Sequence, residues 1–191
     1  MVKKNNLILL IVFAILIIIF VIYINLSNID KTKMILNQDG YVLSEITKPE
    51  IIEVFIKPEW IDTKPNNKAN LNIRLMEKKN TVIYLESVHN RVNDIYFSFS
   101  IKNKMIEDSG TFLSNILFNA DKTNTTYFPK DAFKLTTNNG EKIEIGQISF
   151  GPDFGFSFGI NKNDSELLVK GFNLKYSGLI LYQYSKDDKS K

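Results

Sequence analysis

The feature that most constrains this chain is an unbroken run of eighteen apolar residues, 7–24, near its amino terminus. At about 1.5 Å per residue the run makes a helix of roughly 27 Å, close to the thickness of a bilayer's hydrocarbon core. No charged residue interrupts it, and Lys3 and Lys4 stand before it. The run predicts a membrane-spanning helix, so we expect the rest of the chain to be tied to a lipid bilayer by its front end.

Two interpretations of this run lead to different mature proteins. A cleaved signal peptide has a shorter apolar core, about 7–15 residues, followed by a small-x-small site, and residues 25–27 offer no such site. We therefore expect an uncleaved signal anchor. The positive charges on the two flanks nearly balance, because Lys31 and Lys33 follow the run and Asp30 dilutes them. We expect residues 1–6 in the cytoplasm and the long following domain outside, since a short front segment is easily retained.

Composition excludes several kinds of site. The chain has no cysteine, which removes disulfides, thiolate metal sites and cysteine nucleophiles. Its formal charge is +3, of which Lys3 and Lys4 supply two, and its only arginines are Arg74 and Arg91. No basic cluster of the kind that neutralises phosphates is visible in the sequence, so nucleic acid is not an expected partner. No cofactor is expected either.

Residues 25–40 are predicted to form a juxtamembrane stalk, with Asp30 capping a short helix that Gly40 ends. Beyond it, helical periodicity gives way to short alternating runs separated by turn-forming residues, a pattern typical of strands. The clearest predicted strands are 95–101 and 154–160, in which every second side chain is apolar. Weaker candidates are 51–57, 71–76, 81–88, 111–118, 132–137, 141–150, 167–172 and 179–184. The pair Asn139-Gly140 predicts a hairpin, because both residues tolerate positive φ.

About ten short strands with almost no helix predict one all-β domain over residues 41–184. An antiparallel immunoglobulin-like sandwich is the expected fold, and a small β-barrel is the alternative. The proline-rich segment 48–65 predicts an edge strand or a lead-in segment, since proline cannot sit in a central ladder. Residues 185–191 are predicted to be a disordered, solvated tail.

Residues 155–159 spell GFSFG, which matches the G-x-S-x-G nucleophile elbow of α/β hydrolases. The elbow needs a strand, a sharp turn, a helix and a later histidine. Here Ser157 lies inside an alternating strand, and the single histidine, His89, comes before it. We interpret Gly155, Ser157 and Gly159 as a flat face that admits a close neighbour, in the first place another strand of this chain. His89 is interpreted as an exposed residue of a loop over 89–94.

Asn161, Asn163 and Ser165 have the one-three-five spacing of a calcium loop. Glu166 and Phe172 stand where that loop requires glycine and glutamate, so we interpret 161–166 as a polar turn in which Asp164 and Glu166 bind no metal.

Trp60 lies beside prolines, where an aromatic side chain can contact a ligand. We interpret it instead as closing the end of the core, the commoner role of a single tryptophan.

Three classes of function remain. The first is a non-enzymatic binding or assembly module, anchored in the cell membrane and acting outside it with a protein partner in the membrane or envelope. The second is an envelope enzyme that acts on glycans through paired carboxylates, for which the candidates are Glu53, Glu59, Asp62, Glu86 and Asp153. The third is a sensor that signals through a membrane partner. We expect the first, because no residue pattern predicts a catalytic, cofactor-binding or metal site.

Overall fold

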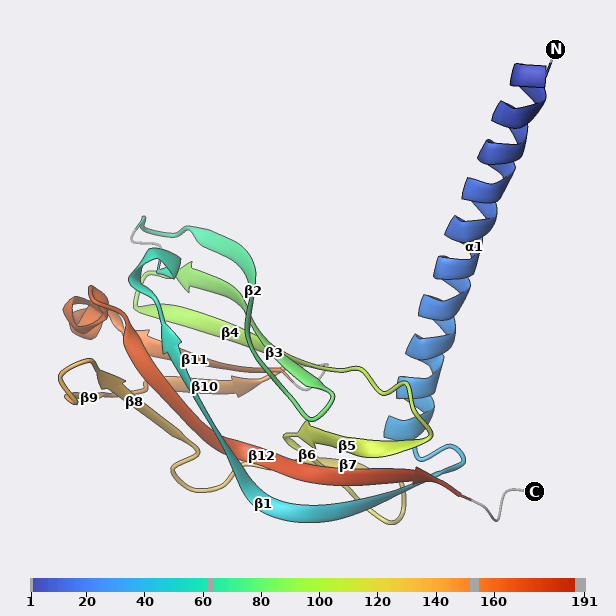
Figure 1. Cartoon of the computed structure of the whole chain (residues 1–191). Coiled ribbons are helices and arrows are strands. Elements are labelled where there is room, and N and C mark those ends of the chain that lie inside the picture. The colour runs from blue at the N-terminus through green and yellow to red at the C-terminus, as the bar shows by residue number, and fades with distance from the viewer. Residues whose placement is uncertain (1, 62–63, 152–154, 188–191) are drawn as a thin grey trace.

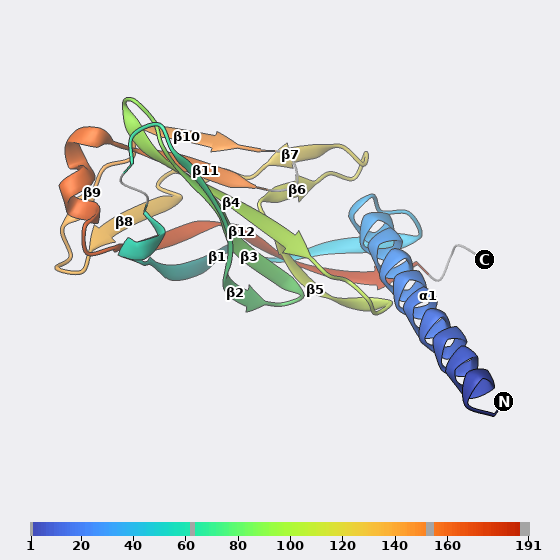
Figure 2. The same ribbon diagram turned by 90° about the horizontal axis from the view of Figure 1, so that it is seen from above.

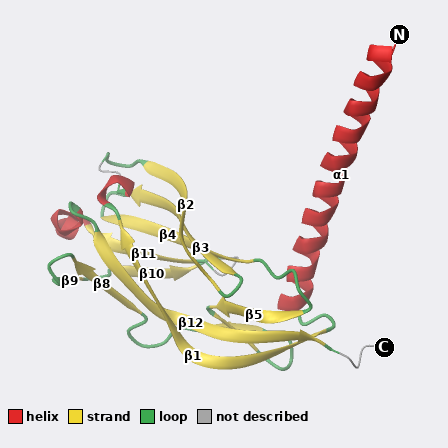
Figure 3. Cartoon of the chain, viewed as in Figure 1, coloured by secondary structure: helices red, strands yellow, loops and turns green. Residues whose placement is uncertain are grey.

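One long helix and twelve strands make up the described part of the chain (Figures 1 and 3). The computed structural model describes residues 2–61, 64–151 and 155–187, without the side chains of 2–8, 10, 25–30 and 48. Strands account for 54% of the structure, which confirms the prediction of a mostly β, antiparallel protein. The helices are α1 (Val2–Leu36) and the short 3-10 segments η1 (Pro58–Trp60) and η2 (Lys162–Leu168). The strands are β1 (Tyr41–Ile56), β2 (Lys68–Lys78), β3 (Thr81–Asn90), β4 (Asp94–Asn103), β5 (Ser109–Ser114), β6 (Ile116–Phe118), β7 (Asn124–Thr126), β8 (Phe133–Thr137), β9 (Lys142–Ile143), β10 (Gln147–Phe150), β11 (Phe156–Asn161) and β12 (Phe172–Lys186).

The strands form two five-stranded antiparallel sheets and a small hairpin. Sheet 1 has the order β1-β12-β8-β9, and β5 also pairs with the long strand β12. Sheet 2 has the order β10-β11-β4-β3-β2, and β6 and β7 form the hairpin. Both sheets are open, so the alternative of a small closed barrel is wrong. β1 is an edge strand with irregular pairing between Glu45 and Ile52, as the prolines of this region predicted.

The main core lies between the two sheets. Phe97 and Phe99 of β4 stack on Phe158 and Phe156 of β11, with ring centroids 5.5 and 4.7 Å apart. Tyr176 of sheet 1 closes on Phe156 at 4.3 Å. All five rings are at most 2% exposed. The predicted alternation of β4 and β11 is therefore confirmed for the described residues, whereas Phe154 lies outside them.

A second, smaller core lies at the other end of sheet 1. Strand β12 changes the side it presents near Gly178, because Tyr176 and Leu179 both point into the main core. From there on, Ile180, Tyr182 and Tyr184 point into the second core. Phe112 of β5, Tyr41 of β1, the fully buried Ile35 of α1 and Met105 of the β4–β5 loop also belong to it. Residues 178–182 of β12 are thus covered on both faces.

Helix α1 runs from Val2 to Leu36 and projects away from the β strands (Figures 1 and 2). Among its described side chains, those that join a core lie in its last turn. The segment predicted as a stalk is the end of this helix and a turn that finishes at Gly40, whose φ is +73°. Among the described residues, no helix combines the length and the apolar character needed to cross a membrane. The membrane-spanning helix predicted at 7–24 is not supported by that finding.

Several predicted element bounds are wrong. Residues 167–172 are not a strand, because the side chain of Asn161 caps η2 and Gly171, at φ +74°, turns the chain into β12. The run 141–150 is divided, since β9 joins sheet 1 and β10 joins sheet 2. The predicted disordered tail begins too early, because β12 includes Ser185 and Lys186. The hairpin at Asn139-Gly140 is confirmed, and Gly140 alone supplies the positive φ.

Candidate functional site

Ser157 is the second residue of β11, on the face of sheet 2 that points away from the main core. Its hydroxyl is 2.6 Å from that of Tyr96 in β4 and donates to the carbonyl oxygen of Ser149 in β10 at 3.3 Å. An elbow serine would sit on a turn before a helix with a histidine as its base. The serine here sits inside a sheet with strands on both sides. The GFSFG segment therefore lacks the geometry of a nucleophile elbow.

His89 belongs to strand β3 rather than to a loop, and it is half-buried, so the interpretation as an exposed loop residue is wrong. It pairs with Lys68 on one side and with Tyr96 on the other. The turn that follows β3 is shorter than predicted and begins at Arg91, because Asn90 still pairs with Ile95.

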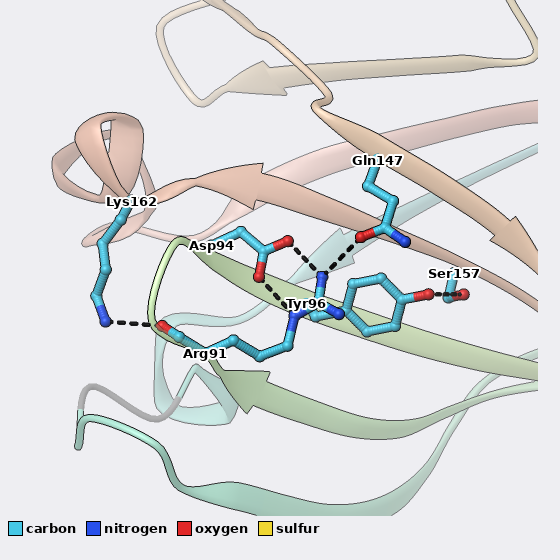
Figure 4. A network of polar contacts seen from close by, with 6 residues as sticks. All are labelled: Arg91, Asp94, Tyr96, Gln147, Ser157 and Lys162. Carbon is cyan, nitrogen blue, oxygen red and sulfur yellow. Dashed lines mark hydrogen bonds and ion pairs between the residues drawn. The ribbon is translucent and has the colours of Figure 1, made fainter.

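A polar network around Arg91 ties the β3–β4 turn to β10 and η2 (Figure 4). Arg91 Nε donates to Asp94 Oδ1 at 2.6 Å, and its terminal nitrogen donates to Asp94 Oδ2 and, at 3.1 Å, to Gln147 Oε1. The guanidinium carbon lies 3.9 Å from the centre of the Tyr96 ring. Lys162 Nζ donates to the carbonyl oxygen of Arg91 at 2.9 Å. The hydrogen bond to Asp94 raises the pKa of Arg91.

Gly159 supplies the space that this network needs. A Cβ at this position would overlap the Asp94 carboxylate, and its cross-strand neighbour in β4 is Tyr96. The flat face of β11 was predicted to have a close neighbour. At Gly159 that neighbour is the Asp94 side chain of the same molecule. Arg91 bonds Asp94 and lies over the ring of Tyr96, whose hydroxyl bonds Ser157. This network stabilises the face, and the described side chains place no free base beside Ser157.

A hollow of about 300 Å³ lies at the end of the β domain where η1 and η2 meet β4. Ile61, Ile95 and Leu168 form its apolar wall, and Lys162 and Glu166 lie on its polar side. Its volume is at the lower limit for a small-molecule site, and the ammonium group of Lys162 is already bonded to Arg91.

The predicted calcium-like spacing has a structural explanation. The side chain of Asn161 accepts a hydrogen bond from the backbone N–H of Asn163 at 3.0 Å and thereby caps η2. In the described residues, no three histidine, aspartate or glutamate side chains come together as metal ligands would.

Trp60 is half-buried and packs against the main core, with Lys57 Nζ 5.4 Å from its ring centre. Its interpretation as the closure of the core is confirmed.

The candidate carboxylates lie on separate elements. Glu53 of β1 is ion-paired with Lys175 at 2.7 Å, Glu59 of η1 lies 3.8 Å from Lys57, and Glu86 belongs to β3 in the other sheet. Asp62 and Asp153 fall outside the described residues.

The closest link between α1 and the β domain is a junction made by Lys31, Thr32, Ile35, Met105 and Asp108, which we call the anchor junction. Thr32 Oγ1 accepts from the backbone N–H of Met105 at 3.1 Å and donates to its carbonyl oxygen at 3.3 Å. Lys31 Nζ lies 2.7 Å from Asp108 Oδ1. This hydrogen bond lowers the pKa of Asp108 and raises that of Lys31. Below the polar contacts, Ile35 is fully buried in the second core.

Sequence reasoning missed both the anchor junction and the Arg91 network. The partners at the junction are more than seventy residues apart, and no local pattern connects them. Arg91 and Asp94 are three residues apart in a turn, so their spacing was a usable signal. Comparison with known proteins yields no match to a family model, a curated protein or a solved structure.

Proposed function

We propose that this protein is a non-enzymatic binding or assembly module held at the outer face of a cell membrane by helix α1. Residues 7–24 lie in the bilayer, residues 1–6 lie in the cytoplasm, and the β domain lies outside, where it engages a protein partner. The two packed sheets act as a rigid β-sandwich, whose immunoglobulin-like connectivity stays a prediction.

The observation that carries the proposal is the exposure of α1. Its described large apolar side chains, at positions 9, 11–13 and 15–24, are between 42% and 74% exposed. They surround the helix instead of forming one stripe, which distinguishes them from the apolar face of a helix that packs on its own domain. An apolar surface of this extent needs a cover, and eighteen successive apolar residues match a bilayer in length.

The anchor junction supports a role in presenting the β domain. Because Ile35 is fully buried and Thr32 bonds both backbone groups of Met105, the β domain follows the helix as one body. The lack of a base beside Ser157 supports binding over catalysis.

Fractionation of cells that express the full chain tests the anchor. We expect the protein in the membrane fraction after washing at alkaline pH, with an intact amino terminus by mass spectrometry. The double substitution Ile15→Lys and Ile19→Lys should release it, since each charge at the centre of a spanning helix costs roughly 2.5–3.5 kcal/mol. Met34→Lys is the matched control, because Met34 is exposed on the same helix but outside the apolar run.

Digestion of intact cells with an added protease tests the orientation, and the β domain should be cleaved from outside. Recovery of the unaltered chain as a water-soluble assembly, with its helices packed on one another, would overturn the proposal.

A further inference from the structure

The fold gathers lysines at the place where α1 leaves the β domain. Lys33 belongs to the last turns of α1, Lys79 to the turn between β2 and β3, and Lys102 and Lys104 to the end of β4. The backbone connects these sites, since Lys104 N–H donates to the carbonyl oxygen of Asn80 at 2.9 Å. The next residue, Met105, bonds Thr32 of α1. Figures 1 and 2 agree in placing the β2–β3 turn at the α1 end of the domain.

We call Lys33, Lys79, Lys102 and Lys104 the lysine collar. All four side chains are exposed, and none forms an ion pair with a described residue. Lys102 Nζ lies 5.2 Å from the centre of the Tyr84 ring, and its side chain is exposed. Lys31 and Asp108 form an ion pair nearby, and the carboxylate of Glu107 also interacts with Lys31. The four collar lysines outnumber the unpaired carboxylate of Glu107, so the described side chains here carry a net positive charge, although the sequence shows no basic run.

The length of α1 sets the distance between the lysine collar and the lipid surface. Lys33 is nine residues beyond the end of the apolar run, or roughly 13.5 Å at about 1.5 Å per residue. The headgroup layer takes up about 5–7 Å of that distance on each side of the hydrocarbon core. The remaining gap of about 7 Å is within one Debye length, which is about 8 Å at physiological salt. The anchor junction prevents the collar from swinging away.

We propose that the lysine collar binds the anionic headgroups of lipids in the leaflet that faces the β domain. This inference rests on the proposed membrane anchor, and it holds for either orientation of the helix. The recognised chemistry is a phosphate-bearing headgroup with a net negative charge. The source is the bilayer, because α1 delivers the collar to that surface and to no other.

Lipid selectivity of the full chain in vesicles tests this inference. The protein is reconstituted in phosphatidylcholine containing 30 mol% phosphatidylglycerol, and spin-labelled forms of the two lipids report which one is retained at the protein surface. A lysine near an anionic surface contributes about 1 kcal/mol, so we expect about a five-fold preference for phosphatidylglycerol. The preference should fall toward unity in 1 M NaCl, where the Debye length is about 3 Å.

A triple variant, Lys79→Gln, Lys102→Gln and Lys104→Gln, should lose most of this preference. Its matched control changes three exposed lysines of the β domain outside the collar, Lys130→Gln, Lys134→Gln and Lys170→Gln, and should keep it.

Three results separate the proposals. Failure of the unaltered chain to float with vesicles overturns the anchor and with it this inference. Flotation with equal retention of both lipids overturns the collar alone. A preference that inorganic phosphate abolishes, but sodium chloride of equal ionic strength does not, would indicate a site for dissolved phosphate and would also overturn lipid binding.

Discussion

Ile35 is the residue through which the helix and the β domain are expected to depend on each other. It is fully buried in the second core, among Phe112, Tyr182 and Tyr184. Ile35→Ala removes three carbon atoms, and the lost transfer free energy of about 0.8 kcal/mol for each gives roughly 2.4 kcal/mol. The cavity left among aromatic rings increases the loss, so the expected destabilisation is about 3–4 kcal/mol.

Urea unfolding of the full chain in detergent micelles measures this loss. The single tryptophan, Trp60, packs against the main core and reports on unfolding of the β domain. We expect a lower urea midpoint for Ile35→Ala with an unchanged slope, as for a change in stability alone. Met34→Ala is the neighbouring control on an exposed side chain and should stay within about 0.5 kcal/mol of the unaltered protein.

A second variant separates packing from hydrogen bonding at the same place. Thr32→Val keeps the shape of the side chain but leaves the backbone N–H of Met105 without its acceptor, and should cost about 1–3 kcal/mol. If Ile35→Ala unfolds at the same urea concentration as Met34→Ala, the helix does not stabilise the β domain, and the argument for a rigid anchor junction fails.

Three further outcomes are expected. Ser157→Ala should lower the free energy of unfolding by about 1 kcal/mol, because its two hydrogen bonds are lost. The variant should keep its membrane association and its cellular role. Loss of that role in a well-folded variant would revive the hydrolase interpretation. Gly159→Ala should destabilise the protein by about 1–3 kcal/mol because its Cβ displaces Asp94, whereas Gly151→Ala, with open space around it, should be neutral in the same urea experiment. The ion pair between Lys31 and Asp108 lowers the pKa of Asp108 below its usual 3.8, so the pair should weaken in acid. The stability that it contributes is complete above pH 3.8 and is lost as the pH falls through the lowered pKa. Asp108→Asn should therefore remove this part of the pH dependence of the urea midpoint.

Local pattern was sufficient for the strands that bury one face. In β4 and β11 the alternation of phenylalanine with small polar residues identifies both the strand and its buried side, because side chains alternate across a strand whatever its partner. The Asn139-Gly140 turn was equally readable, since the positive φ of Gly140 is a property of the residue itself. The interpretations of 161–166 as a polar turn and of His89 as an exposed loop residue show the limit of this reasoning. Asn161 caps a 3-10 helix and His89 pairs within a sheet, and neither role leaves a signal in neighbouring residues.

The sequence by itself determined the apolar run, the absence of cysteine and the antiparallel β character of the rest, because each depends on composition or on a period of two residues. Only the tertiary structure decided how these parts meet. It splits 141–150 between two sheets, places the two faces of β12 beyond Gly178 in two different cores, and seats Ile35 between strands far away in the chain. It also brings Lys79, Lys102 and Lys104 to the α1 end of the β domain (Figure 1), although they are spread over 26 residues of sequence. Pairing between distant strands depends on packing and register across the whole domain, and this information is not contained in any single stretch of residues.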